Sequence, residues 1–350
     1  MRAWQVTRYG RPTEALELVD APDPTPGPRE VLVRTTASVL NYNEVDGCHG
    51  RYLTINPALP YTLGMECVGE VVAVGEGADR WLGRRVTASG TGATGAHADL
   101  AVCPTAMTFE APEQLTDVEA AAFFYPFHLA HLGLHERGRL QPGETVVVHA
   151  AAGGVGSAAV QLAVAAGARV IATVGNADKV EIVTGLGAHV VVNYRERDFA
   201  DVVLGETSGA GADVCFDGVG GDIMMQSLRC LGHGGRRLVV GFASGIEAEE
   251  VPMISGRVFC FGNFDVLGVI LAYVDDDVVP VATSYVAVPV PRFNPPSATE
   301  GEQVQAHLLE LLNAGAIRPI VGRTLPFDDL PQALEEMESR TTTGRLVLTR

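Results

Sequence analysis

The sequence predicts an α/β protein in which a doubly wound parallel sheet is joined to a smaller β-barrel. Residues 1 to about 110 show short, evenly spaced strand patterns between Gly/Pro turns, which is typical of a small barrel. From residue 145 to about 271, strand patterns alternate with helical ones, which indicates a parallel sheet covered by helices. We expect the barrel domain to comprise residues 1–122 and 276–350, and the parallel-sheet domain to comprise residues 123–275.

The first domain should be built from strands that include Leu16–Val19, Glu30–Ala37 and Gly69–Gly75. A helix is expected after these strands, because Thr116 and Glu119 have the spacing of a capping box. An apolar helical stretch then leads into the second domain.

A glycine-rich turn follows the first strand pattern of the second domain. Ala151, Gly153 and Gly156 occupy the three glycine positions of the dinucleotide-binding fingerprint, with alanine replacing the first glycine. Gly153 would let the backbone approach a pyrophosphate, and Gly156 would let the helix pack onto the strand. The phosphates would face the N–H groups of Gly154, Val155 and Gly156. An ordinary glycine-rich turn is the alternative.

The end of the next strand, Arg169–Gly175, distinguishes between the two nicotinamide dinucleotides. An acid that holds the ribose 2′-OH is expected about 20 residues beyond the glycines, but a Thr-Val-Gly tripeptide stands there. Lys179, Tyr194 and Arg195 follow, and a cationic rim without a carboxylate favours the 2′-phosphate of NADP(H). Asp178 could be the missing acid, although the first turn of a helix is the simpler explanation for it.

Further strands are expected at 213–217, at 236–242 and within 258–271. The loops Asp217–Gly221 and Gly241–Gly245 follow two of these strands. Because ligands of such sheets lie beyond the carboxyl ends of the strands, we expect both loops beside a nicotinamide ring.

The stretch 274–300 interrupts the alternation with Asp275-Asp-Asp277 and a proline-rich run. It is either a flap over the cleft between the domains or a mobile linker, and the flap is favoured. The acidic triplet indicates a solvated turn rather than a cation site. An amphipathic helix over Glu302–Ala314 and a final strand over Arg345–Leu348, which can return to the barrel, complete the chain.

Composition restricts the partners and the compartment. The 350 residues are 47% hydrophobic and 19% charged, with 42 acidic and 25 basic residues and a net charge of −17. This charge repels nucleic acid and anionic membranes, so neither is expected as a partner. The six cysteines form no Cys-x-x-Cys pair, and the N-terminus has no basic-then-apolar leader. We therefore expect a protein of the reducing cytoplasm that does not span a membrane.

His128, His131 and His135 fall on one face of the expected helix and could hold a metal ion. They have no nearby carboxylate or cysteine in the sequence, so packing or hydrogen bonding is the favoured interpretation. His149 ends a strand and is expected to be a core residue with hydrogen-bond partners. Gly241–Gly245 has the wrong spacing for a nucleophile elbow, so no serine hydrolase is indicated.

Taken together, several motifs resemble the medium-chain dehydrogenase/reductase superfamily, and within it the zinc-free quinone oxidoreductase (zeta-crystallin-like) branch. The resemblance covers nearly the whole chain and implies a GroES-like β-barrel catalytic domain plus a Rossmann doubly wound sheet. The motifs are Leu40-Asn-Tyr-Asn-Glu44, Leu59-Pro-Tyr-Thr-Leu-Gly-Met-Glu66, Ala151-Ala-Gly-Gly-Val-Gly156, Asn193-Tyr-Arg-Glu196, Phe216-Asp-Gly-Val-Gly-Gly221 and Thr343-Gly-Arg345.

The resemblance implies an NADPH-dependent reductase of quinones or conjugated enones. In the zinc-dependent branch, a cysteine precedes the loop that Asn41 occupies here and a histidine stands where Met65 does. Both ligands are replaced, so no catalytic metal is expected. Asn41 and Tyr52 are the expected catalytic hydrogen-bond donors, with Tyr52 or water supplying the proton. The resemblance places cofactor contacts at Asn41, Ala152, Gly153, Gly154, Val155, Lys179, Tyr194, Gly241, Phe242, Ala243, Ile270, Leu271 and Arg345.

One segment, 123–131, departs from the family pattern: Pro126 and Leu129 stand where hydroxyl-bearing residues are common, which suggests a more apolar pocket. Two alternatives therefore stay open. One is an enoyl- or acryloyl-CoA-type reductase, against which the acidic composition argues weakly. The other is a non-catalytic NADPH-binding sensor or structural protein. The resemblance also implies a homodimer that pairs a strand within 258–271.

Overall fold

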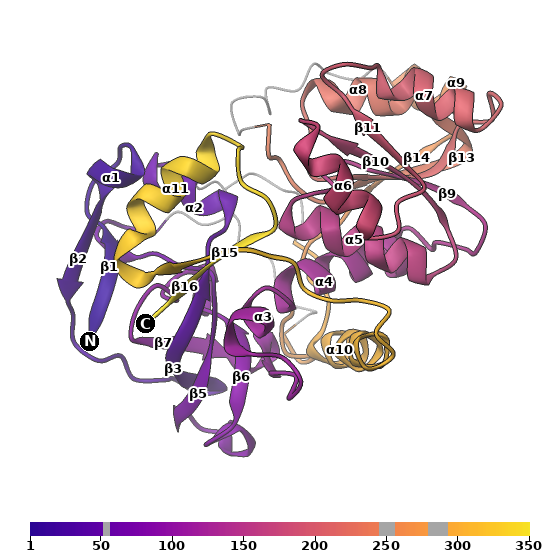
Figure 1. Ribbon diagram of the computed structural model, residues 1–350. Helices are drawn as coiled ribbons and strands as arrows, with labels where there is room; N and C mark the ends of the chain where they lie inside the picture. Colours follow the sequence, from indigo (N-terminus) through magenta and orange to yellow (C-terminus); the bar gives the residue numbers. More distant parts are fainter. Residues whose placement is uncertain (52–56, 245–255, 279–292) are drawn as a thin grey trace. The chain divides into compact units, whose positions relative to one another are not determined.

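The computed structural model describes residues 1–51, 57–244, 256–278 and 293–350 (Figure 1). These residues form two compact units. The first comprises Met1–Phe124, Ala272–Ala306 and Pro319–Arg350, and the second comprises Tyr125–Leu271 and His307–Arg318. Residues 307–318 therefore group with the second unit, whereas the expected division placed them in the barrel domain. Within the described ranges, no helix is both long and apolar enough for a membrane span.

The second unit is built on a parallel sheet whose strands run in the order β11-β10-β9-β12-β13-β14. Numbered along this unit, the order is third, second, first, fourth, fifth, sixth, which is that of the Rossmann fold. The predicted doubly wound sheet is therefore confirmed. The strands are β9 (Thr145–Val148), β10 (Arg169–Val174), β11 (Val190–Asn193), β12 (Ala212–Asp217), β13 (Leu231–Val239) and β14 (Asp265–Gly268).

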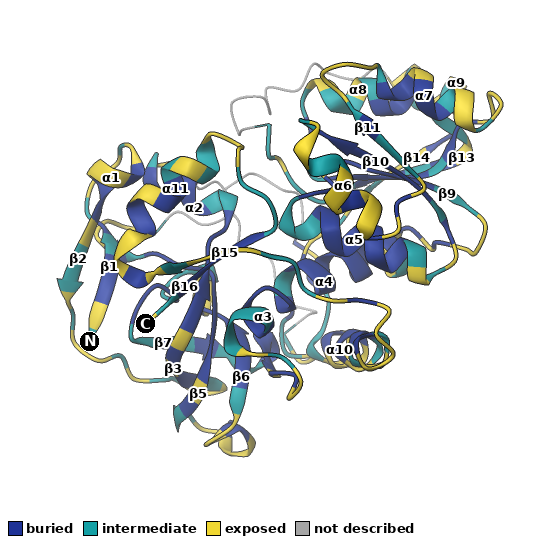
Figure 2. Cartoon of the chain, in the orientation of Figure 1, coloured by how far each residue is buried: buried dark blue, intermediate teal, exposed yellow. Residues whose placement is uncertain are grey.

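Helices connect these strands, as right-handed parallel crossovers require. The central strand β9 is buried along most of its length, and so is most of the helix that follows it (Figure 2). The apolar stretch before β9 forms α4 (Phe124–His131) and continues as a π-helix over Leu132–Arg137. The other helices are α5 (Gly154–Ala165), α6 (Asp178–Gly185), α7 (Phe199–Glu206), α8 (Asp222–Arg229) and α9 (Gly256–Gly262).

The first unit contains a small sheet in the order β2-β1-β4 and a larger one in the order β15-β16-β3-β5-β6-β8, with β7 also paired to β3. The last strand pairs antiparallel with β3 through Val347 and Val39, so the chain returns to this unit as predicted. The strands are β1 (Arg2–Val6), β2 (Leu16–Asp20), β3 (Glu30–Val39), β4 (Tyr61–Thr62), β5 (Glu66–Val74), β6 (Arg85–Ser89), β7 (Leu100–Pro104), β8 (Thr108–Glu110), β15 (Val321–Pro326) and β16 (Arg345–Thr349).

The helices of this unit include one whose start was predicted from its cap. The Thr116 hydroxyl accepts from the Glu119 N–H at 3.3 Å, and the Glu119 carboxylate accepts from the Thr116 N–H at 2.9 Å. The helices are α1 (Pro12–Ala15), α2 (Tyr42–Cys48), α3 (Asp117–Ala121) and α11 (Leu330–Glu338). Helix α10 (Ala298–Asn313) begins four residues earlier than the amphipathic pattern predicted and continues into the second unit.

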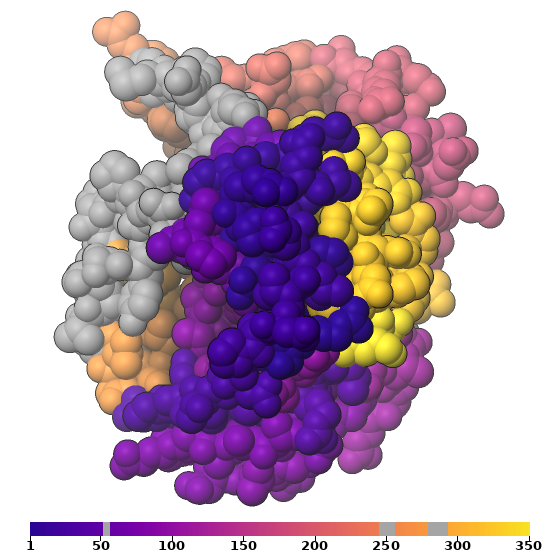
Figure 3. All heavy atoms as spheres, turned by 90° about the vertical axis from the view of Figure 1, so that its left-hand side faces the viewer, coloured from indigo at the N-terminus to yellow at the C-terminus, as the bar shows by residue number. Residues whose placement is uncertain are grey.

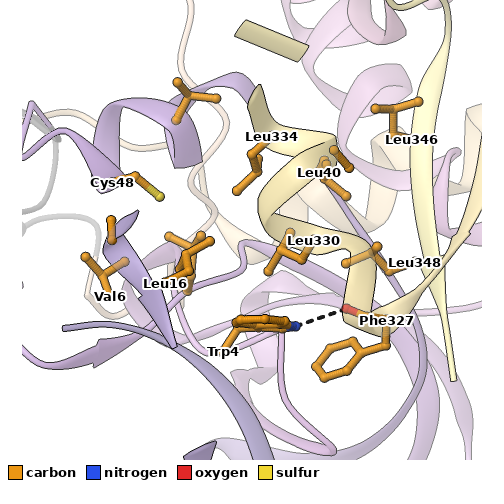
Figure 4. Packing of buried hydrophobic residues seen from close by; sticks show 14 of the residues in the cluster. Trp4, Val6, Leu16, Leu40, Cys48, Phe327, Leu330, Leu334, Leu346 and Leu348 are labelled. Atoms are coloured by element: carbon orange, nitrogen blue, oxygen red, sulfur yellow. Dashed lines mark hydrogen bonds between the residues drawn. The ribbon is translucent and has the colours of Figure 1, made fainter. Parts of the chain in front are cut away.

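The two ends of the chain share a hydrophobic core in the first unit. Figure 3 shows N-terminal residues and the C-terminal segment side by side on one face. In the interior, Leu330 and Leu334 of α11 pack in one cluster with Trp4 and Leu348, and the Trp4 indole donates to the Phe327 carbonyl at 3.0 Å (Figure 4). Burial of these side chains fixes β16, whose first residue is the predicted site residue Arg345.

Candidate functional site

The strand order of the second unit places two loops at one point of the sheet. The order reverses between β9 and β12, which are neighbours and parallel. Loops after neighbouring parallel strands leave the same edge of the sheet, and a ligand crevice forms where the order reverses. The loop after β9 is the predicted glycine turn, and the loop after β12 is Asp217–Gly221.

The glycine turn has the close packing that the fingerprint requires. The Gly153 N–H donates to the Ala150 carbonyl at 2.9 Å, and α5 begins at Gly154. A Cβ on Gly156 would lie 2.3 Å from the Ala150 carbonyl oxygen, so no larger residue fits without moving the backbone. The first N–H groups of α5 have no acceptor within the helix and carry its positive dipole end, which suits an anionic phosphate.

Two cationic residues of the predicted rim, Lys179 on α6 and Arg195 after β11, lie close to each other. A Cβ on Gly175 would lie 2.7 Å from the Tyr194 hydroxyl, so the end of the Tyr194 side chain lies against this glycine. Burial, and then the charge of Arg195, lower the pKa of Lys179 from its usual value. Lys179 and Arg195 are therefore close enough to repel each other, and a dianionic phosphate between such groups would relieve that repulsion.

A buried ion pair that sequence reasoning did not single out holds the loop after β12. Asp217 accepts from the N–H groups of Val219 at 2.8 Å and Gly220 at 2.9 Å through one oxygen. Its other oxygen accepts from Arg237 of β13, and both side chains are almost completely buried. Burial acts to raise the pKa of Asp217, but His149, Arg237 and the two N–H groups outweigh it, so the pKa is lowered.

The loop after β13 is tied to the loop after β12. The N–H of Ala243 donates to the Gly218 carbonyl at 3.1 Å, and the N–H of Ser244 donates to the Val219 carbonyl at 2.9 Å. Phe242, which directly precedes these anchored positions, is 51% exposed. Ile270, which follows β14, is 39% exposed, whereas Leu271 is buried. The structure thus brings the predicted residues 241–243 beside Asp217–Gly221.

In the first unit, three residues from distant parts of the chain form a buried polar group. The guanidinium of Arg345 donates to Asn41 Oδ1 at 3.0 Å and also to the Glu66 carboxylate. Asn41 donates from Nδ2 to the Val39 carbonyl at 3.2 Å. Burial raises the pKa of Glu66, against the opposing charge of Arg345. Asn41 and Arg345, both predicted site residues, therefore lie in contact.

A second carboxylate, Glu44, holds the two positions at which the zinc-dependent branch has metal ligands. Its oxygens accept from the backbone N–H groups of Met65 at 2.9 Å and Asn41 at 3.1 Å. The Glu44 carboxylate also lies 3.0 Å from Nε2 of His97, whose Nδ1 lies 2.9 Å from the Ser38 hydroxyl. This Ser-His-Glu chain is fully buried, so it positions the two loops and is closed to a substrate. Glu44 lies in a motif of the sequence, but nothing there indicated His97 as its partner.

A catalytic zinc ion does not fit this donor set. Asn41 offers an amide already bonded to Arg345, and Met65 offers a thioether 3.5 Å from Asn43 Nδ2, whereas zinc selects thiolate, imidazole and carboxylate ligands. In the described part of the chain, no three His, Cys, Asp or Glu side chains are arranged to hold a metal ion. Tyr52, the other expected catalytic donor, lies outside the described residues, as does much of the expected flap.

The helical histidines meet a residue that the sequence did not indicate. His131 Nε2 lies 2.9 Å from Nδ1 of His307 on α10, and the ring centroids of His131 and His135 lie 4.7 Å apart. The predicted hydrogen bonding is therefore confirmed for His131. His149 also has the expected partners, with Thr173 at 3.0 Å and Ser227 at 2.9 Å.

A Rossmann sheet with a glycine turn at its reversal point, in a chain that also carries a β-rich unit, defines a dinucleotide-dependent oxidoreductase of two-domain type. Family models agree: residues 27–113 match the alcohol dehydrogenase GroES-like domain, and residues 154–284 match the zinc-binding dehydrogenase family. Human quinone oxidoreductase is 30% identical over 99% of this chain and 97% of its own length.

Solved structures share the whole fold. Quinone oxidoreductase of Escherichia coli, complexed with NADPH, has a TM-score of 0.83 and 27% identity, with 100% of both chains covered. The CurK enoyl reductase has a TM-score of 0.80 and 26% identity, with 99% of this chain and 98% of its own covered. The chain belongs to the medium-chain dehydrogenase/reductase superfamily, in its zinc-free quinone oxidoreductase branch.

The buried histidines predict a loss of stability in acid. Burial, followed by neighbouring histidines, lowers the pKa of His131 to about 3 and that of His135 to about 4, from 6.5. Between these values the unfolded chain binds more protons than the folded one, so the stability that neutral histidines contribute is complete above pH 6.5 and falls as the pH drops toward 4.

We expect the free energy of unfolding, measured with urea at a series of pH values, to show this decrease. In His131→Phe the slope of that free energy against pH should be smaller by up to about 1.4 kcal/mol per pH unit. An equally steep decrease in the variant would contradict the claim that His131 contributes to the loss of stability in acid.

Proposed function

We propose that the protein is a zinc-independent oxidoreductase that uses NADP(H) to reduce a quinone or a conjugated enone. The observation that carries the proposal is that Lys179 and Arg195 lie close to each other and Tyr194 lies against Gly175, while β10 ends without a carboxylate. That rim suits the 2′-phosphate of NADP(H). The packing of Gly156 against Ala150, and the hydrogen-bonded loops after β12 and β13, suit the rest of a dinucleotide.

The cofactor, when bound, supplies the hydride, and the protein supplies orientation, hydrogen bonding and exclusion of water. The N–H groups at the start of α5 would bind the pyrophosphate, and the loops at Gly218 and Gly241 would border the nicotinamide. Asn41 would donate to the substrate oxygen that gains charge, with Tyr52 or water as the proton source. Ile270 and Leu271 remain proposed cofactor contacts.

The direct test is an acceptor screen. We expect NADPH to be oxidised by benzoquinone-type acceptors or simple enones, faster than NADH, and without added metal. The measurement is the decrease in absorbance of the nicotinamide, with chelator-treated protein as the control. The screen also includes crotonyl-CoA, because the chain is similar in structure to an enoyl reductase. If crotonyl-CoA alone is reduced, the enoyl thioester alternative is correct. Tight NADPH binding without oxidation by any acceptor would favour the non-catalytic alternative.

Substitution of Lys179 tests the cofactor preference. We expect Lys179→Ala to weaken NADPH binding about tenfold, because one charge-assisted contact to the 2′-phosphate is lost. NADH binding should change little, since NADH has no 2′-phosphate. Fluorescence titration of both cofactors gives the two dissociation constants. Glu181→Ala, on the same helix, serves as the control variant. Equal weakening of NADH and NADPH would contradict a role in 2′-phosphate recognition.

We also propose a homodimer in the cytoplasm. Strand β14 stands at the end of the described sheet order, and exposed apolar side chains gather on it and near it, namely Phe261, Val266 and Ile270. Edge strands with apolar side chains are suited to pairing with a second copy. All six cysteines are free thiols, which suits a reducing compartment.

Light scattering at micromolar concentration should give twice the mass of one chain, and Val266→Lys should reduce it toward that of a monomer. A monomeric wild type would contradict the dimer.

A further inference from the structure

The glycine turn begins at a residue with an unfavourable backbone conformation. Ala150, which directly precedes the fingerprint, has a φ of 50°, in the left-handed region that residues with a Cβ disfavour. Its carbonyl accepts from the Gly153 N–H at 2.9 Å and would lie 2.3 Å from a Cβ on Gly156. The conformation of Ala150 therefore determines where α5 begins. Strained conformations of this kind persist only where the surrounding structure holds them.

Both neighbours of Ala150 are bonded to Thr173, near the end of β10. The Ala151 N–H donates to the Thr173 carbonyl at 3.1 Å, and Nδ1 of His149 lies 3.0 Å from the Thr173 hydroxyl. His149 and Thr173 are each 2% exposed, so water does not replace the contact between them. These two hydrogen bonds, which we call the Thr173 clamp, hold the chain on both sides of the left-handed residue.

The hydrogen bonds of His149 have one direction. Burial lowers the pKa of His149 to about 4, so the ring is neutral at neutral pH and carries a single N–H. Nε2 lies 2.9 Å from the hydroxyl of Ser227, which donates its own hydrogen to the Ile223 carbonyl at 2.7 Å. Burial raises the pKa of Cys215, so this residue stays a thiol and is a further donor to Ser227. The N–H of His149 is therefore on Nε2, and Nδ1 accepts from the Thr173 hydroxyl.

We propose that His149 is a positioning residue which, fixed in one tautomer by Ser227, accepts from Thr173 and thereby holds the glycine turn in the conformation that binds a pyrophosphate. Because NADH and NADPH share the pyrophosphate, the Thr173 clamp should act on both cofactors, whereas Lys179 should act on NADPH alone. This inference deepens the proposed function and rests on the binding of a dinucleotide at the glycine turn.

The test combines Thr173→Val with Ala150→Gly. The first change removes the hydroxyl and keeps the β-branched shape, and the second removes an exposed methyl group and makes the left-handed conformation accessible without a clamp. Fluorescence titration gives the dissociation constants of NADPH and NADH for the wild type, both single variants and the double variant, and Tm is measured for each. We expect Thr173→Val to weaken both complexes by about tenfold, because a buried hydrogen bond is lost. Ala150→Gly alone should stay within about twofold of the wild type, and the double variant should recover to within about threefold.

Two further variants separate positioning from a general loss of stability. The matched control is Thr207→Val, which removes a hydroxyl that donates to the Val203 carbonyl at 2.8 Å and accepts from the Gly211 N–H at 2.9 Å in the same unit. It should lower Tm and leave both dissociation constants unchanged. Thr173→Ser keeps the hydroxyl and should keep both dissociation constants within about twofold of the wild type.

Unchanged dissociation constants in Thr173→Val, or weak binding that Ala150→Gly does not restore, would overturn the proposal. A wild type that binds neither dinucleotide would instead overturn the proposed function. In that case the Thr173 clamp is read from Tm. The decrease that Thr173→Val causes should be smaller in the Ala150→Gly background, and equal decreases would overturn the clamp.

If Thr173→Val does not fold, the ring nitrogens of the wild type decide. NMR of histidine-labelled protein should show the N–H of His149 on Nε2, with the signal identified by its loss in His149→Asn. An N–H on Nδ1 would overturn the proposal, because His149 could not then accept from Thr173.

Discussion

The structure around the site depends on one constraint, which is that a buried carboxylate must be surrounded by donors. Glu44, Glu66 and Asp217 are almost completely buried, and an unpartnered charge in such a place costs several kcal/mol. Each carboxylate stands where a strand or helix meets a loop. Glu44 and Asp217 each accept from two backbone N–H groups and also contact a buried His97 or Arg237, whereas Glu66 accepts from the Arg345 guanidinium.

The same bonds explain why the loops have defined shapes. Asp217 fixes the turn after β12 by accepting hydrogen bonds from two of its backbone N–H groups. Carbonyl groups of the same turn accept hydrogen bonds from the loop after β13. Glu44 joins the start of α2 to Met65 through backbone N–H groups as well. Removal of one member of a buried pair of this kind costs about 3–5 kcal/mol, because the other member stays buried and unpaired. Because internal hydrogen bonds already fix the conformation of these loops, they can orient a ligand without first being ordered by its binding.

The sequence could predict features that depend on local pattern. Strand alternation, the capping box at Thr116 and the glycine spacing after β9 are each encoded within a few residues, and the structure reproduces them. Pairings such as Arg345 with Glu66, or His131 with His307, join residues far apart in the chain. No periodicity encodes such pairings: the first arises when β16, β3 and β5 pair in register, and the second when α4 lies against α10. Motif membership singled out Asn41 and Arg345, but it did not show that they bond to each other.

The choice of arginine at residue 345 has a consequence for how the site responds to pH. A guanidinium stays protonated at every pH at which proteins fold, so its bond to the Asn41 oxygen has one direction only. A histidine in the same place would exchange donor for acceptor near neutrality and let the amide reverse. Glu66, whose pKa burial raises, can take up a proton without ending the contact between Arg345 and Asn41, because that contact uses a different nitrogen. The groups that titrate in acid, His131 and His135, belong to the other unit. The contact between Arg345 and Asn41 is thus independent of the two histidines, and the titratable group that adjoins it is Glu66, which also hydrogen-bonds to Asn41.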